Sequence, residues 1–274
     1  MSVIDIDLDL GEITEDEEDS SLKLPRGYMS NSQVQTYYQC GYKYYLSYCE
    51  DAPRKSSVAT SLGKSVHRLV EDTLRDVMEG KPLRSMEQAM DEASGIVSAE
   101  LSDLESLADP DTGAERDEGH WVDEARKYYR VWHQMRAKNV EPVAVEKRFR
   151  TIVKGVPVTG VIDLIDISEG PTIVDLKVTK RKKSQKDLKN STQLALYGHV
   201  EGIARIGYDN VVKKKVPELH TIRETLSKKE GEWAATLVRD VADCVTKEVF
   251  PKTSPDNWWC SERFCDHWSK CRGK

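Results

Sequence analysis

The segment "GVIDLIDISEGPTIVDLKV", residues 160–178, consists of two apolar runs separated by the turn-forming residues "SEGP" at 168–171. Runs rich in Val, Ile and Leu on either side of such a turn are typical of a β-hairpin. A turn at this point pairs residues whose numbers sum to about 338, so Asp163 faces Asp175. Facing residues on antiparallel strands have Cβ atoms roughly 4.5–5.5 Å apart. The hairpin is therefore predicted to hold two carboxylates close together.

Lys177 follows Asp175 by two residues, so its side chain is expected on the same face of the strand, with Val174, Leu176 and Val178 on the other face. Two carboxylates at this spacing can hold a divalent metal, which stabilises developing charge and lowers the pKa of bound water. Lys177 could position that water or help to deprotonate it. A ladder of surface ion pairs, worth under about 1 kcal/mol, would account for the same residues. The hairpin alone leaves both interpretations open.

Further extended and helical patterns surround the hairpin. "PVAVEKRFRTIV" at 142–153 precedes it, and together the three extended runs predict an antiparallel meander. Strands framed by helices predict an α/β or α+β fold, with one mixed central sheet as the core. The other expected elements are helices at about 31–48, 61–80, two within 85–138, 191–207 and 228–249, and one or two strands within 210–226.

The composition indicates a globular protein, with 38% hydrophobic and 32% charged residues among 274. No apolar run approaches the roughly 18 residues needed to cross a membrane, and no export signal begins the chain, so we expect a cytoplasmic protein. Residues 1–20 hold nine acidic and no basic residues. We expect residues 1–24 to form a disordered acidic tail, either simply solvated or competing with a polyanion for the rest of the chain, and residues 25–274 to form a single domain.

The motifs around the hairpin resemble those of the PD-(D/E)XK nuclease superfamily. Asp163 with Asp175, Leu176 and Lys177 is similar to the D…(D/E)xK core of that family. "GKSVH" at 63–67, "GVID" at 160–163 and "QLALY" at 193–197 resemble the GxxxH, GxxD and QxxxY motifs of its RecB-like branch, in the same order. This resemblance extends over most of residues 28–271 and implies a restriction-endonuclease-like fold, with 85–138 as a helical insertion.

The resemblance also implies roles for individual residues. Magnesium or manganese would be the metal, and an imidazole ligand suits manganese better. Glu146 is a further acidic candidate, although a plain strand-end charge explains it equally well. The metal ligands would be His67, Asp163, Asp175 and the backbone carbonyl of Leu176, and Lys177 would serve the attacking water. Gln193 and Tyr197 would contact DNA and support the site. Packing in the core is the alternative role of Tyr197.

A basic segment lies between Lys177 and the QxxxY motif. Its charges suit contacts with DNA phosphates, although charge runs are often only solvated surface. "GKS" at 63–65 lacks the glycine and the preceding strand of a phosphate-binding loop, so a DNA motor would have to be a helicase or recombination partner. The predicted DNA-binding residues are Lys180, Arg181, Lys182, Lys183, Lys186 and Lys189.

Three cysteines lie within "WWCSERFCDHWSKCRGK", residues 258–274, and Cys40 lies about 220 residues earlier. This arrangement resembles the iron–sulfur staple of some RecB-like nucleases, including CRISPR-associated exonucleases and the AddB subunit. It implies a 4Fe-4S cluster held by Cys40, Cys260, Cys265 and Cys271, in which the segment 256–274 closes onto Cys40. The CxxxxC spacing, and Gly41 in place of a proline, depart from that pattern. A zinc site, perhaps including His267, is the alternative.

Together these features predict a metal-dependent DNA nuclease. We expect an exonuclease that acts on DNA ends or single strands, in recombination, repair or phage replication. The main alternative is a non-catalytic or partner-dependent subunit that binds DNA ends or processes protospacers. A structural metal module with a decayed site is a third. The sequence does not specify an oligomeric state.

Overall fold

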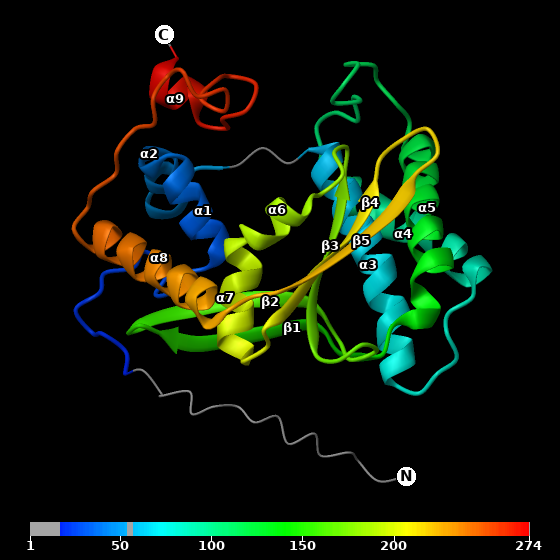
Figure 1. Ribbon diagram of the computed structural model, residues 1–274. Helices are drawn as coiled ribbons and strands as arrows, with labels where there is room; N and C mark the ends of the chain where they lie inside the picture. The colour runs from blue at the N-terminus through cyan, green and yellow to red at the C-terminus, as the bar shows by residue number, and fades with distance from the viewer. Residues whose placement is uncertain (1–16, 54–56, 274) are drawn as a thin grey trace.

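The computed structural model describes residues 17–53 and 57–273, and it centres on one five-stranded sheet (Figure 1). The strand order is β1-β2-β3-β4-β5. Only β3 and β4 are parallel; the other neighbouring strands are antiparallel. The predicted mixed sheet and the meander of its first three strands are thus confirmed. The strands are β1 (Pro142–Val153), β2 (Val156–Asp166), β3 (Thr172–Thr179), β4 (Arg205–Val212) and β5 (Glu218–Thr225).

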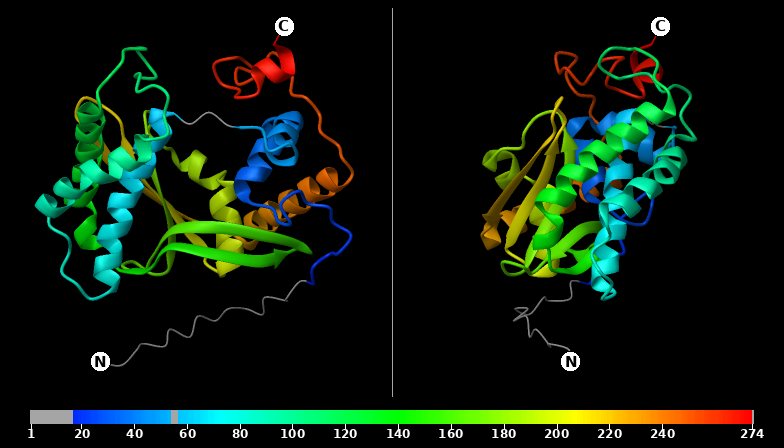
Figure 2. Two further views of the ribbon diagram at one scale, coloured as in Figure 1. Left: turned by 180° about the vertical axis from the view of Figure 1, so that it is seen from behind. Right: turned by 90° about the vertical axis from the view of Figure 1, so that its right-hand side faces the viewer.

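Helices cover both faces of the sheet. One face packs against α1 (Asn31–Gln39), α2 (Gly41–Tyr44), α7 (Thr192–Glu201) and α8 (Lys228–Thr246), around a core that includes Ile173 and Ile206. The other face packs against α3 (Val58–Met78), α4 (Met86–Leu101) and α5 (Glu118–Met135), around Val174 and Val211. Figure 2 shows these two groups of helices at opposite sides of the sheet. The expected insertion at 85–138 is therefore one of the layers that cover the sheet. Shorter helices are η1 (Tyr45–Cys49), η2 (Ala137–Asn139), α6 (Gln185–Lys189) and α9 (Trp268–Arg272).

The register of the hairpin is the one that the sequence predicts. Leu164 pairs with Val174 and Asp166 pairs with Thr172, both with numbers that sum to 338. Pairing ends at Leu164 and Val174, one position before Asp163 and Asp175. Beyond this point β2 continues along β1, while β3 continues along β4 as far as Thr179. The two strands thus form a fork, and the two aspartates lie where it opens.

Two expected helices differ from the structure. The helix predicted at 31–48 is interrupted at Cys40, whose backbone is extended at φ −169° and ψ 114°. The interruption brings Gly41 against Pro251: a Cβ on Gly41 would lie 2.6 Å from Pro251 Cδ, and Tyr42 N–H donates to the Pro251 carbonyl at 3.1 Å. The helix predicted at 191–207 ends at Glu201, because Gly202 adopts φ 67° and terminates it. β4 begins in the second part of that range, earlier than the strands expected from residue 210.

Most of the expected acidic tail, residues 1–16, lies outside the described residues. The part that is described contacts the body of the protein. Asp19 N–H donates to the Gly155 carbonyl at 2.9 Å, and Leu22 and Leu24 pack against the core. Contacts with the body thus begin well before the predicted boundary at residue 24.

Candidate active site

Asp163 occupies the opening of the fork. Its Oδ2 accepts a hydrogen bond from the Leu176 N–H at 3.0 Å, so a carboxylate takes the place that a facing strand would fill. Burial, reinforced by the nearby charge of Asp175, raises the pKa of Asp163 to about 7, while Lys177 and the Leu176 N–H act against this rise. A carboxyl group with such a raised pKa is poorly compensated by the protein itself.

Asp175 and Lys177 form a contact pair on β3. Asp175 Oδ1 accepts from Lys177 Nζ at 2.9 Å and from Gln193 Nε2 at 3.0 Å. Asp175 Oδ2 is buried and accepts no hydrogen bond, although Lys177 Nζ lies 2.8 Å from it. Burial alone would lower the pKa of Lys177, but the charges of Asp175 and Asp163 outweigh it and the pKa is raised. Buried side-chain oxygens usually have hydrogen-bond partners, so this Asp175 oxygen, held only by its ion pair with Lys177, can take a further ligand.

His67 comes to the site from α3. Ser57 caps this helix, and its buried apolar residues, among them Val66 and Leu69, fix it against the sheet. The His67 Nδ1 atom lies 3.5 Å from Asp163 Oδ2. Burial lowers the pKa of His67, partly offset by Asp175 and by the backbone of Leu176. The imidazole and the Leu176 backbone thus face the same point as the Asp163 carboxylate.

Glu146 on β1 lies opposite Asp163 on β2. The two residues stand between the strand pairs Val145–Leu164 and Lys147–Ile162. The φ of 47° at Glu146 is uncommon for a residue with a side chain, and such strain often occurs at functional sites. Burial and the neighbouring Asp163 raise its pKa.

One group of potential metal ligands stands out within residues 17–53 and 57–273. One ligand atom each from His67, Glu146 and Asp163 lies within 4.8 Å of the others. These three residues line a cavity of about 20 Å³, enough for one water molecule or ion. Asp175 is not in this group, because its carboxylate points toward Lys177 and Gln193. The structure thus brings Glu146 into the cluster and places Asp175 beside it.

Gln193 and Tyr197 lie one helical turn apart on α7, but they do different things. Gln193 contacts Asp175, whereas Tyr197 is buried and packs edge-on against Phe149, with ring centroids 5.3 Å apart. Burial raises the pKa of Tyr197 to about 12. A Cβ on Gly160 would lie 2.5 Å from the Phe149 ring and 2.8 Å from the Tyr197 ring. The glycine of the GxxD motif is therefore needed so that both rings can pack against β2.

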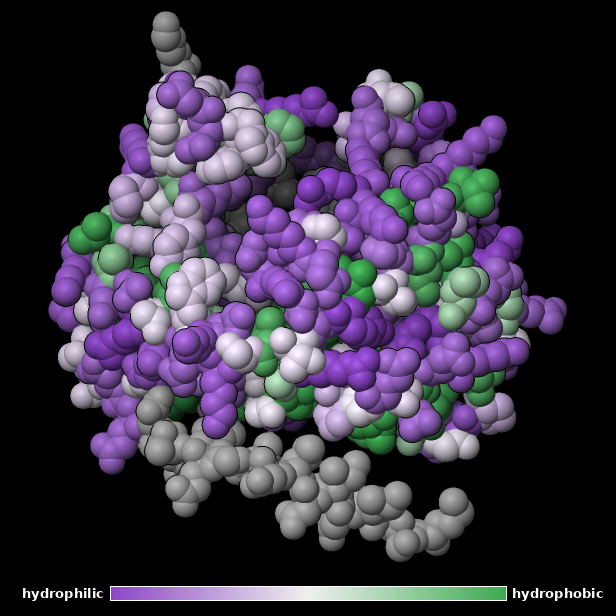
Figure 3. All heavy atoms as spheres, in the orientation of Figure 1, coloured by the Kyte–Doolittle hydropathy of each residue, from purple (hydrophilic) through white to green (hydrophobic). Residues whose placement is uncertain are grey.

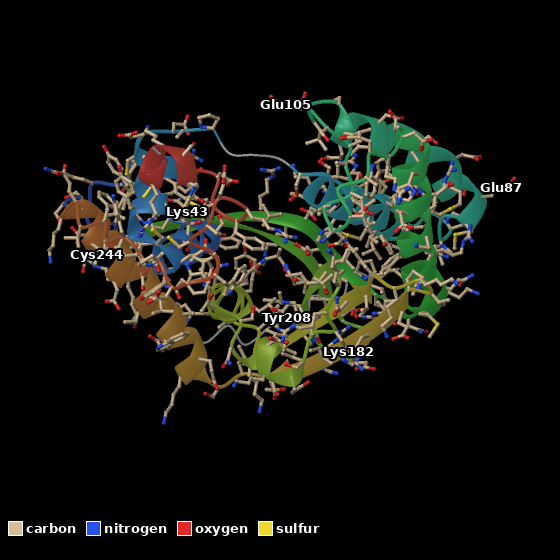
Figure 4. The ribbon with its side chains drawn as sticks, turned by 90° about the horizontal axis from the view of Figure 1, so that it is seen from above. Lys43, Glu87, Glu105, Lys182, Tyr208 and Cys244 are labelled. Carbon is tan, nitrogen blue, oxygen red and sulfur yellow. The ribbon has the colours of Figure 1, made fainter. Side chains whose placement is uncertain are left out.

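The basic segment divides into two groups. Arg181, Lys183 and Lys186 line a groove of about 540 Å³ that reaches Gln193, and hence the edge of the metal-ligand cluster. The other three do not line this groove: Lys180 pairs with Asp111, Lys189 pairs with Glu224, and Lys182 lies outside it, whereas Tyr208 lines it (both labelled in Figure 4). Arg181 itself pairs with Asp187 at 2.8 Å. The structure therefore gathers three of the six predicted DNA-binding residues beside the site.

The groove and the cluster also include residues that sequence reasoning missed. Asn31 and Gln35 of α1 form the wall of the groove opposite the basic segment. Glu71 lines the cavity with His67. Its position four residues after His67 on one helix face was a usable signal, because side chains at that spacing are neighbours. Asn31 and Gln35 had no comparable signal, since a long-range contact brings α1 beside α6 and α7.

The four predicted cluster cysteines line one cavity of about 30 Å³ between α2 and the C-terminal segment, residues 256–272. Cys49 and Cys244 do not line it. Burial raises the pKa of Cys265, and the nearby Cys40 adds to this rise. His267 also lines the cavity; it is buried, and its Nε2 lies 2.8 Å from Ser47 Oγ. Gly41, which departs from the resembled pattern, is explained by its close contact with Pro251.

Known proteins resemble this chain in sequence and in fold. One subunit of the ATP-dependent helicase/deoxyribonuclease of Streptococcus agalactiae, from serotypes III, Ia and V, is 26% identical over 236 residues, which cover 84% of this chain and 20% of the relative. The chain thus spans about a fifth of the length of these relatives. The crystal structure of a Eubacterium rectale protein described as "Putative exonuclease" matches with a TM-score of 0.53 at 14% identity, over 86% of this chain and 87% of that one. This match supports the predicted restriction-endonuclease-like fold.

No helix in the described part of the chain is long and apolar enough to cross a membrane.

The family profile of the PD-(D/E)XK nuclease superfamily matches residues 28–272, which include the fork, α3, α7 and all four cluster cysteines. The chain therefore belongs to the PD-(D/E)XK nuclease superfamily.

Proposed function

We propose that this protein is a divalent-metal-dependent deoxyribonuclease, and specifically an exonuclease that hydrolyses phosphodiester bonds at DNA ends or in single strands during recombination, repair or phage replication. One observation carries this proposal. The ligand atoms of His67, Glu146 and Asp163 lie within 4.8 Å of one another, beside an Asp175 oxygen that is buried and accepts no hydrogen bond.

The donor set fits a magnesium or manganese ion. Carboxylate oxygens suit both metals, and the His67 imidazole favours manganese. Ligands would come from His67, Glu146 and Asp163, with Asp175 and the Leu176 carbonyl beside them. When bound, the metal would polarise the phosphate and lower the pKa of a coordinated water.

Other residues of the chain would orient the substrate and support the site. Lys177 presents a positive charge next to Asp175, where it can orient a water molecule or a phosphate oxygen. Gln193 holds the Asp175 carboxylate, and Tyr197 fixes α7 against β1 through Phe149. Arg181, Lys183 and Lys186 line the adjoining groove, where their charges would hold DNA phosphates.

A digestion assay tests the proposal. We expect the purified protein to release nucleotides from end-labelled DNA with manganese or magnesium and not with EDTA, and to release fewer as salt rises, because phosphate contacts weaken with salt. Asp175→Ala and Lys177→Ala should abolish release. The proposal would be refuted if the wild-type protein, with its cysteine site filled, cut no DNA with any divalent metal.

A second candidate is a partner-dependent or non-catalytic subunit that binds DNA ends or processes protospacers. The observation that favours it is the relation to one fifth of a helicase/deoxyribonuclease subunit, since this chain would then supply only the nuclease part of an assembly. Addition of a cognate helicase separates the two candidates. Cleavage by the isolated protein supports the first, whereas DNA binding without cleavage until the partner is added supports the second.

We also propose that Cys40, Cys260, Cys265 and Cys271 hold a 4Fe-4S cluster, because four thiolates around one cavity are the set that a cubane cluster requires. Zinc needs a similar set and is the alternative. A brown protein with about four irons per chain would support the cluster, and a colourless protein with one zinc would support the alternative. Free thiols that remain available for ligation suit a reducing cytoplasm.

A further inference from the structure

The C-terminal segment exposes aromatic side chains to solvent. Trp258 is 67% exposed and Phe264 is 47% exposed. Their rings contact each other edge to face, with centroids 5.0 Å apart. Single exposed apolar residues are common and need no explanation, whereas exposed apolar side chains that contact each other form a continuous surface that can bind a ligand.

These rings are held in position. The neighbouring Trp259 donates from its Nε1 to the Gln39 carbonyl at 3.2 Å, which fastens the segment to the end of α1. The Trp258 carbonyl accepts from Ser261 Oγ at 3.0 Å within the same turn. Trp258 therefore projects from a fixed base, and little conformational freedom would be lost when a flat ligand stacks on it.

Basic groups are interleaved with the rings. The Arg263 guanidinium lies 5.3 Å from the centre of the Phe264 ring, the Lys252 ammonium 4.6 Å from that of Tyr42, and the Arg272 guanidinium 5.8 Å from that of Trp268. Residues 251–274 contain five Lys or Arg against three Asp or Glu. The surface thus combines flat apolar faces with a positive balance, which suits an anionic ligand that carries aromatic rings.

Helix α1 links the segment to the groove, because Trp259 is bound to Gln39 at the C-terminal end of this helix. The segment lies over α1 and α2, and α1 supplies Asn31 and Gln35 to the groove wall (Figure 1). On the face shown in Figure 3, the surface is hollowed between this part of the molecule and the part formed by α3 and the loop after α4. A strand that leaves the basic groove past α1 would meet the C-terminal segment.

We propose that Trp258 and Phe264 form a stacking site for the unpaired bases of single-stranded DNA, outside the metal-ligand cluster, in which Arg263, whose guanidinium lies over the Phe264 ring, would move to a phosphate as a base stacks. This inference rests on the proposed function, since the strand would be the substrate of that site. Every base offers a flat face, and stacking on an aromatic side chain is worth about 1–3 kcal/mol per base. Bases within a duplex are already stacked, so the site would select an unpaired strand.

Fluorescence anisotropy with a labelled oligothymidylate tests this site. All proteins carry Asp175→Asn and are measured in EDTA, so no cleavage interferes. Trp258→Ala and Phe264→Ala should each weaken binding by roughly 5- to 100-fold, which corresponds to the loss of one stacked base. Trp258→Phe keeps a π face and should restore most of the affinity. Trp233→Ala, a change at a 55% exposed tryptophan on α8, is the matched control and should have no effect.

An abasic oligonucleotide of the same length separates stacking from charge. The wild-type protein should bind it more weakly than oligothymidylate, and Trp258→Ala should remove most of that difference. Unchanged affinity for oligothymidylate in Trp258→Ala would overturn the inference, as would an equal loss on the abasic strand, which would indicate a contact with the sugar-phosphate backbone or a misfolded segment. Because cleavage is measured separately, either result leaves the proposed nuclease standing, and a failure to cleave DNA leaves the stacking result standing.

Discussion

Two pairs of aspartates lie in this sheet, all buried except Asp163, which is partly exposed, and the two pairs are held in different ways. Asp166 accepts hydrogen bonds from the backbone N–H groups of Glu141 and Ser168, both at 3.0 Å, and pairs with the Arg136 guanidinium. Asp209 pairs with the same guanidinium at 3.1 Å and with that of Arg223 at 2.8 Å. Protein groups thus fully match the charges of Asp166 and Asp209, which form the structural pair.

At the fork, in contrast, the carboxylates are matched only in part, by Lys177 and Gln193. Asp163 has a pKa raised to about 7, and Asp175 keeps a buried oxygen that accepts no hydrogen bond. The two sets lie on the same strands or their neighbours, so burial alone does not distinguish them. The difference is in their partners. Two arginines and two backbone N–H groups hold the structural pair, whereas the fork offers its two carboxylates one lysine, one glutamine and one backbone N–H, which leaves it suited to a cation.

The largest effect should come from the loss of charge at the fork. Asp175→Asn keeps the shape of the side chain but removes charge beside the metal ligands, so we expect the cleavage rate to fall by roughly 10³-fold, which corresponds to about 4 kcal/mol in the transition state. The fold should persist, with a thermal midpoint within about 4 °C of the wild type, because Asn keeps an acceptor for Lys177 and Gln193 and the partly exposed Lys177 ammonium can still be solvated. Single-turnover cleavage and a melting curve measure both quantities. An active variant, or one that unfolds, would remove the distinction between the two pairs.

The opposite outcome is expected for the arginine-held pair. Arg136→Met leaves two buried carboxylates with one fewer guanidinium, which should lower the free energy of unfolding by about 3–5 kcal/mol. The folded fraction should still cleave DNA at the wild-type rate. Urea denaturation at pH 7 measures the loss, with Arg148→Met, a change at an exposed arginine on β1, as the control. A similar loss of unfolding free energy in both variants would show that the buried ion pairs of Arg136 contribute no more to stability than an exposed arginine does.

The sequence predicts these two regions unequally, for a physical reason. The turn at 168–171 fixes the register of the hairpin locally, so the approach of Asp163 to Asp175 follows from residue numbers alone. Asp166 lies 30 residues from Arg136, and Asp209 lies 73 residues from it, so no local pattern joins them. The break at Cys40 likewise depends on a contact with Pro251, about 210 residues away. Local periodicity predicts a continuous helix there, because it contains no information about that partner.

Gly160→Ala should disturb the side-chain packing that supports the fork without changing any charge. The new methyl group would meet the rings of Phe149 and Tyr197 at 2.5–2.8 Å, and overpacking of this kind costs about 1–3 kcal/mol. Since Tyr197 anchors the helix that carries Gln193, the cleavage rate should also fall, by less than in Asp175→Asn. Combining Gly160→Ala with Phe149→Leu, which shortens the nearer side chain, should recover part of the stability. No recovery in the double variant would count against a clash with the rings.

The smallest effect concerns pH and the arginine-held pair. Burial alone would raise the pKa of Asp166, but the N–H groups of Ser168 and Glu141 and the charge of Arg136 outweigh it, so the pKa lies below its usual range. A carboxyl whose pKa is lower in the folded state stabilises the fold above its unfolded pKa of about 3.9, and this contribution disappears as the pH falls through the folded value. Asp166→Asn should therefore be less stable than the wild type at pH 7, and the difference should shrink below about pH 4. Urea denaturation at pH 7 and at pH 3 measures it. A difference that stays constant would mean that Asp166 acts through its shape and neutral hydrogen bonds, and the charge-matched pair would then be distinguished from the fork by Asp209 alone.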